Sequence, residues 1–196
     1  MTLTTAHSQN RQIVVDKVND NVRIIEAQGT CIGGFTATKL LFIAMQTYVS
    51  PQDTVHKIIT NVNTSHSLGA FDDAIMLIRT MNDEVIELHS DNSNNNVKTI
   101  QYGLPTITTT RTKNLTTTTY NSNATDVCRN INYWSISVEN INKLKSGVKK
   151  IKIQFEKGIY EKEFKKDKIG TILYDGYLSE LKQMAKDKNQ DFKDNF

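Results

Sequence analysis

The sequence predicts a mainly β fold, namely an antiparallel sandwich or half-barrel with one C-terminal amphipathic α-helix packed on it. Three observations lead to this fold class. The chain of 196 residues contains two prolines and many β-branched residues, several segments alternate apolar and polar side chains between turn-forming residues, and one late segment keeps apolar side chains at helical spacing. The length suits one domain, which we expect over residues 1–186, followed by a polar tail over residues 187–196.

The first part of the chain predicts strands separated by polar or glycine-rich turns. The expected strands are residues 12–18, 22–32, 35–49 and 54–63. The stretch from Thr38 to Met45 is also compatible with a helix, because its apolar run leaves no polar face to set the period, and we favour a strand. The glycines around Cys31 do not follow the pattern of a phosphate-binding loop and indicate a bend or a bulge.

The middle of the chain predicts two hairpins. Residues 74–90 form the first, with Met81 to Glu84 as its turn, and a polar loop from Asp91 to Asn96 then separates neighbouring strands. Residues 99–125 are rich in threonine, whose branched Cβ favours extended backbone and whose hydroxyl tolerates solvent. We expect a solvated two-stranded hairpin here, with low-complexity disorder as the competing interpretation.

The last part of the chain has the clearest patterns. Ser137 caps a short expected helix that stops at Gly147, and residues 150–155 and 160–165 form an expected hairpin with one buried and one charged face. Asp167 caps an expected helix that runs to Lys186 and must dock on a sheet face. Its apolar stripe consists of Ile169, Ile172, Leu173, Tyr177, Leu181 and Met184.

Charge is distributed unevenly along the chain. The segment from Lys143 to Lys168 holds ten lysines and four acidic residues, a balance of +6, whereas the whole chain carries +3. Such a segment is either a surface for an acidic partner or the solvated face of a hairpin. The candidate binding residues are Lys150, Lys152, Lys162 and Lys165, and we expect the first three to be exposed. Nucleic-acid binding is possible but not favoured, because the segment has no arginine and acids interleave its lysines.

No pattern indicates catalysis, a metal or another cofactor. The four histidines are scattered, and Cys31 and Cys128 lie far apart without a CxxC motif, so we expect two buried thiols, with a bridge or a reactive thiol as alternatives. Residues 163–165 match the Glu-x-Lys fragment of metal-dependent nucleases but lack the preceding aspartate. We therefore expect no enzyme. The alternative is a nuclease or nucleic-acid binder that acts through the hairpin of residues 149–168.

The N-terminus has no basic stretch followed by an apolar one, and no window approaches the roughly 18 apolar residues of a membrane helix. We expect a cytoplasmic protein without a membrane partner, although a chain whose leader had been removed would look the same.

Two segments carry a resemblance to a known group. Leu144 to Ile153 and Tyr160 to Gly170, with the helix that follows, resemble β-rich proteins of gut-dwelling bacteria and their mobile elements, and Ile75 to Leu88 is similar to another segment of those proteins. The resemblance implies the same fold, but it implies no activity and no site residues. The expected function is a non-catalytic interaction module with a protein partner or self-association, such as a phage or mobile-element structural subunit or an immunity-type inhibitor. Assembly by strand addition would suit the threonine-rich hairpin.

Overall fold

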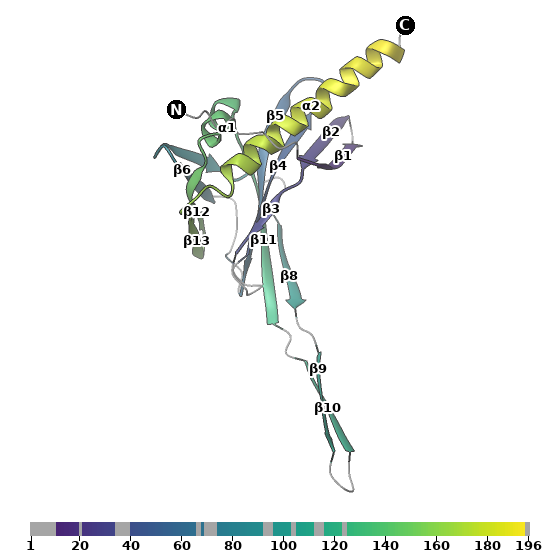
Figure 1. The fold of residues 1–196 in the computed structure, drawn as a ribbon, viewed down its shortest axis with the longest axis vertical. Coiled ribbons are helices and arrows are strands. Elements are labelled where there is room, and N and C mark those ends of the chain that lie inside the picture. The colour runs from purple at the N-terminus through teal and green to yellow at the C-terminus, as the bar shows by residue number, and fades with distance from the viewer. Residues whose placement is uncertain are drawn as a thin grey trace, which may run out of the picture.

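In the computed structural model the chain forms two antiparallel sheets that pack face to face, with helices against them (Figure 1). The structure describes the backbone of residues 11–19, 21–33, 40–65, 68, 74–91, 96–102, 105–111, 116–122 and 125–194. Side chains are described for the same ranges except within 96–126 and 187–194. The predicted fold class, a mainly β antiparallel structure with a C-terminal helix packed on a sheet, is confirmed.

The larger sheet has seven strands in the order β1-β2-β4-β5-β11-β8, with β3 also paired to β4. Their bounds are β1 (Ile13–Asn19), β2 (Val22–Ala27), β3 (Thr30–Ile32), β4 (Leu41–Val49), β5 (Thr54–Thr64), β8 (Asn96–Tyr102) and β11 (Thr125–Ser135). The predicted strand over residues 22–32 is divided at Gly29, where an added Cβ would lie 2.4 Å from the carbonyl oxygen of Ile43. The missing side chain of Gly29 therefore allows this close approach of the two backbones. The described part of the stretch from Thr38 to Met45 is a strand and not a helix.

Strand β11 has no counterpart among the predicted elements, although it lies inside the larger sheet. Its inner face carries Asn130, Asn132 and Trp134 at alternate positions, and all three are fully buried. Two of these side chains are polar, so the alternation that normally marks a strand is absent. The amide of Asn130 donates to the carbonyl oxygen of Val62 at 2.9 Å, and Trp134 Nε1 donates to Thr60 Oγ1 at 2.8 Å.

The smaller sheet has the order β13-β12-β6-β7 and contains both predicted hairpins. Its strands are β6 (Ile75–Thr80), β7 (Val85–His89), β12 (Val148–Phe155) and β13 (Gly158–Glu163). The turn between β6 and β7 holds Asp83 at φ 62°. The polar loop from Asp91 to Asn96 was expected between neighbouring strands, and this is wrong: β7 and β8, which precede and follow it, belong to different sheets. Residues 92–95 themselves lie outside the described chain.

The remaining strands, β9 (Pro105–Arg111) and β10 (Thr116–Ser122), pair with each other in a separate antiparallel ladder. We call this pair the ribbon. Figure 1 shows it extending away from the sandwich, beyond the ends of β8 and β11. The predicted two-stranded hairpin within residues 99–125 is thus confirmed for the backbone.

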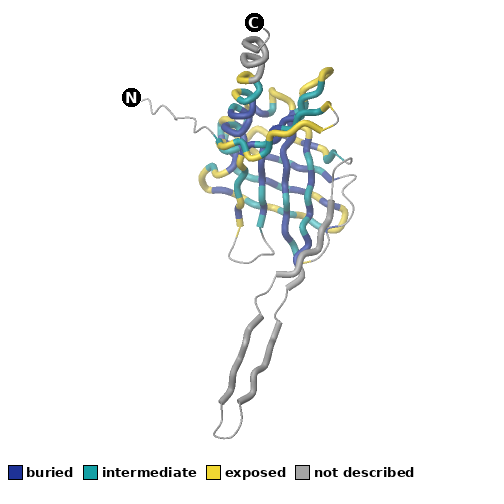
Figure 2. Tube along the Cα trace, turned by 90° about the vertical axis from the view of Figure 1, so that its right-hand side faces the viewer, coloured by how far each residue is buried: buried dark blue, intermediate teal, exposed yellow. Residues whose placement is uncertain are grey.

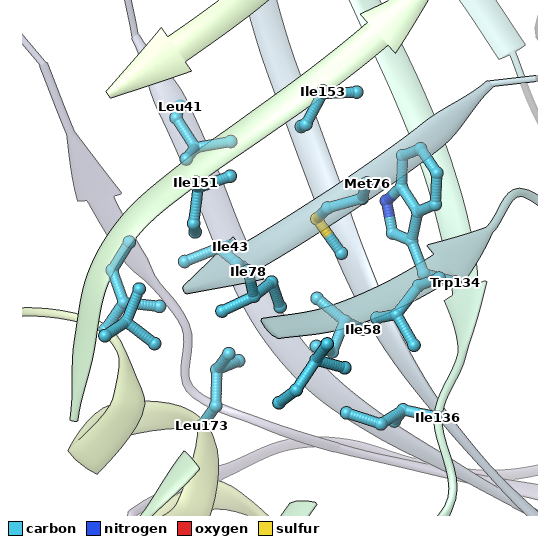
Figure 3. Close-up of a cluster of buried hydrophobic side chains, with 14 of the residues drawn as sticks. Leu41, Ile43, Ile58, Met76, Ile78, Trp134, Ile136, Ile151, Ile153 and Leu173 are labelled. Atoms are coloured by element: carbon cyan, nitrogen blue, oxygen red, sulfur yellow. The ribbon is translucent and has the colours of Figure 1, made fainter. Parts of the chain in front are cut away.

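The core lies between the two sheets (Figures 2 and 3). The smaller sheet contributes Met76, Ile78, Ile151 and Ile153, and the larger sheet contributes Leu41, Ile43, Met45, Ile58 and Trp134. All of these side chains are 0–1% exposed. Burial of each is worth roughly 1.5–3 kcal/mol relative to an exposed position, which makes this cluster the main stabilising element of the fold.

The first helix begins at its predicted cap, and the second begins three residues after the residue predicted to cap it. The Ser137 side chain accepts from the backbone N–H of Asn140 at the start of α1 (Val138–Leu144), and Gly147 follows its end at φ 93°. Helix α2 (Gly170–Asp194) begins after Asp167, whose carboxylate accepts from three N–H groups of residues 169–171. Burial alone would raise the pKa of Asp167, but hydrogen bonds from Thr171 and backbone N–H groups hold it below its usual value. Residues 187–194, predicted as a polar tail, continue the helix.

Helix α2 packs across β2 and β4 of the larger sheet and against α1. Its buried face contains Ile169, Leu173, Tyr177 and also Glu180, whereas the predicted Leu181 and Met184 are half-buried. A Cβ on Gly176 would lie 3.3 Å from the Cβ atoms of Ala27 and Met45, so this glycine allows the helix to approach the sheet closely. None of the described helices combines the length and the apolar composition needed to cross a bilayer.

Candidate functional site

The predicted lysine surface is divided between two sides of the smaller sheet. Ile151 and Lys162 are register partners across β12 and β13, so Lys162 lies on the same face as the buried Ile151. Lys150 and Lys152 lie on the opposite, outer face. The four candidate lysines therefore do not form one surface. Lys150, Lys152 and Lys162 are half-buried, which corrects the expectation that they are exposed, and Lys165 is exposed.

Two lysines of β12 form ion pairs. Lys150 Nζ lies 2.7 Å from Glu161 Oε1, and Lys149 Nζ lies 2.8 Å from Asp83 Oδ1. The hydrogen bond from Lys150 lowers the pKa of Glu161, and the nearby charge of Lys152 acts in the same direction. These lysines behave as the solvated face of a hairpin.

Lys162 and Lys165 instead line a cleft of about 800 Å³ between β3, the end of β13 and the start of α2. We call it the basic cleft. Its lining consists of Thr30, Cys31, Ile32, Gly33, Lys162, Glu163, Phe164, Lys165, Lys166, Lys168 and Ile172. Four lysines thus face one carboxylate. None of the four forms an ion pair within the described part of the chain, in contrast to Lys149 and Lys150.

The two cysteines differ in exposure. Cys31 is exposed on the wall of the basic cleft, and Cys128 is buried in β11; both are free thiols. The prediction of two buried thiols is therefore wrong for Cys31. Sequence spacing gave no signal of this, because β3 is a three-residue strand whose accessibility depends on what packs beside it.

A second polar site, which sequence reasoning missed, lies between α2 and the larger sheet. Glu180 is 0% exposed; its Oε1 accepts from the backbone N–H of Ala27 at 3.0 Å, and its Oε2 lies 2.6 Å from Thr47 Oγ1. The Thr47 hydroxyl also lies 2.8 Å from Nδ1 of His56, and the His56 ring meets the Tyr177 ring edge to face. We call Glu180, Thr47 and His56 the Glu180 network.

Burial shifts both titratable members of the Glu180 network, Glu180 and His56, toward their uncharged forms. Burial raises the pKa of Glu180 to about 8, against hydrogen bonds from Thr47 and Ala27 that lower it, and the nearby charge of Glu26 raises it further. Burial lowers the pKa of His56. Thr47 Oγ1 donates to the ionised Glu180 carboxylate. When Glu180 carries a proton this contact can reverse, so that Glu180 donates to Thr47 and the Thr47 hydroxyl donates to the neutral His56 ring. Glu180 and Thr47 are fully buried, whereas His56 is 8% exposed and lines a surface pocket with Val55 and Ile136.

Within the described residues, no group of three or more His, Cys, Asp or Glu side chains is arranged to hold a metal ion. Glu163 and Lys165, the nuclease-like fragment, are both exposed. Comparisons with protein-family models, with curated proteins and with solved structures find no match.

Proposed function

We propose that this protein is a non-catalytic assembly subunit, such as a structural subunit of a phage or mobile element, and that copies join by strand addition through the ribbon. The observation that carries this proposal is the ribbon itself. Its ladder runs over seven register pairs, from Arg111 with Thr116 to Pro105 with Ser122, and neither strand pairs with any other described strand. It extends beyond the sandwich instead of packing on it (Figure 1).

A ribbon of this kind favours a partner for a physical reason. A two-stranded hairpin without a third strand or a packed face is marginally stable in water. Both of its outer edges carry backbone donors and acceptors that an added strand can pair with. Little of the usual protection of such edges is present: the one proline, Pro105, is at the first position of β9, and Arg111, at its last position, is the one charged residue in the two strands. Pairing with another chain supplies the third strand that the ribbon does not have among the described residues.

The lysine arrangement supports this proposal over the alternative of a nuclease or nucleic-acid binder at residues 149–168. Lys150 and Lys152 are on the outer face of the smaller sheet, whereas Lys162 and Lys165 are at the basic cleft. A phosphate backbone that contacted one pair would not reach the other along a single surface.

Removal of the ribbon tests the proposal without disturbing the sandwich. Tyr102 and Thr125 are register partners at the ends of β8 and β11, so residues 103–124 can be replaced by Asn-Gly, the preferred two-residue hairpin turn. We expect the full chain to sediment as an oligomer of its 22.2 kDa unit. The replaced chain should sediment as a monomer and unfold at a similar temperature, because the core is intact.

Thr118→Val is the matched control. Thr118 is in the third of the seven register pairs, opposite Thr109, and valine keeps the branched Cβ that favours a strand, so this variant should assemble like the full chain. An unchanged oligomer after ribbon replacement, or a full chain that is monomeric at every concentration, would contradict the proposal.

A further inference from the structure

We propose that the basic cleft is a second interaction site, separate from the ribbon, and that it binds an extended acidic peptide segment of a protein partner. Two independent features of the cleft support this proposal. One is the pair of strand edges that border it, and the other is the charge gathered on its walls.

The strand edges come from different sheets. β3 pairs with β4 along one side, and β13 pairs with β12 along one side; neither has a second strand partner among the described residues. The cleft lies between these two edges, with Thr30 to Gly33 on one wall and residues 162–166 on the other. An extended segment in the cleft can therefore pair its main chain with either edge, as in β-augmentation.

The positive charge on the walls of the cleft favours a segment with acidic side chains. Lys162, Lys165, Lys166 and Lys168 line the cleft and are free of ion pairs in the described structure, so their charge is not compensated from within the fold. Glu163 is the one carboxylate on the lining. Carboxylates spaced along an extended partner match this arrangement and would speed its association.

A peptide fits this cleft better than a nucleic acid does. The lining contains no arginine, and its one aromatic side chain, Phe164, is 6% exposed, so no ring is available to stack on a base. Ile172 is the apolar side chain of the lining that is only half-buried, and it suits an apolar side chain of an extended segment.

The test uses a fluorescent decapeptide of alternating Glu and Val and measures its binding by anisotropy. We expect binding to the full chain, and a loss of about tenfold or more in affinity for the Lys162→Glu, Lys165→Glu double variant. The matched control is Lys150→Glu, Lys152→Glu, which makes the same change in charge on the outer face and should bind nearly as well as the full chain. An equal loss in both variants, or no binding to the full chain, would overturn the proposal.

Cys31 gives a second readout at the site itself. It is exposed on the cleft wall, whereas Cys128 is buried, so a maleimide should modify Cys31 alone in the folded chain. Bound peptide should slow this modification. If single-stranded DNA protected Cys31 from the maleimide and the peptide did not, the ligand of the cleft would be a nucleic acid. That result would overturn the proposal. The ribbon-replaced chain should bind the peptide unchanged, which separates failure of this site from failure of the assembly proposal.

Discussion

Glu180→Gln is expected to stabilise the protein at pH 9 and to leave its stability at pH 4 nearly unchanged. Glu180 is fully buried between α2 and the larger sheet, where burial raises its pKa to about 8 from the ordinary value of 4.5. Glutamine has the same shape and can keep both contacts, accepting from Ala27 and donating to Thr47, but it carries no charge at any pH.

The sign of the effect follows from proton binding. Between about pH 4.5 and pH 8 the folded state keeps a proton on Glu180 that the unfolded state has lost, so the stability of the native protein falls as the pH rises through this window. A shift of this size corresponds to on the order of 5 kcal/mol in the free energy of unfolding. The difference between the variant and the native chain should grow across the window and level off above it. His56, whose pKa burial lowers, has the opposite sign: its contribution is lost as the pH falls.

Denaturant unfolding at pH 4, 7 and 9 measures this difference. Glu84→Gln is the control, because Glu84 is exposed in the turn before β7 and should change stability by less than about 0.5 kcal/mol at each pH. A constant difference between the Glu180→Gln and native chains across the three pH values would show that Glu180 does not titrate with a raised pKa.

Leu173→Asp is expected to destabilise the protein by about 4 kcal/mol or more. Leu173 is 0% exposed on the face of α2 that packs on the core (Figure 3), so the substitution removes its packing and places an unpaired carboxylate among apolar side chains. Thermal unfolding followed by circular dichroism gives the change. The fraction of the variant that is folded at 25 °C should be measurably lower than that of the native chain.

Ala185→Asp controls for the helix alone. Ala185 is exposed on the same helix, and aspartate there should cost less than about 1 kcal/mol through helix propensity. If the two variants unfolded at the same temperature, α2 would not be docked through Leu173.

Local signals in the sequence predicted much of the fold correctly. Ser137 and Asp167 mark both helix starts, because a side-chain oxygen that accepts N–H groups is needed at each and few residue types provide one. The β6–β7 and β12–β13 hairpins follow from alternation on either side of a short turn. These features depend on neighbours along the chain, so the sequence contains the information that fixes them.

The sequence did not predict features that depend on which elements meet. Glu180 occupies the buried stripe of α2 because Thr47 and Ala27 offer it partners, and neither residue is near it in sequence. Asn130 obscures the alternation of β11 for a similar reason, because its buried amide donates to the carbonyl oxygen of Val62. Lys162 follows the alternation of β13 onto the inner face, but its position at an open strand edge lets it line the basic cleft. The basic cleft lies between β3 and β13, and no spacing of residues in the sequence indicates that these two strands come close together.

Hydrogen–deuterium exchange of the ribbon amides tests the central claim most directly. The full chain would be labelled at a low and at a high protein concentration, and peptides from residues 105–122 would be compared with peptides from β4 and β12. If copies assemble by strand addition, the ribbon amides should exchange quickly when dilute and be protected when concentrated, with the sandwich strands unchanged. Ribbon amides that exchange equally at both concentrations would contradict assembly through the ribbon.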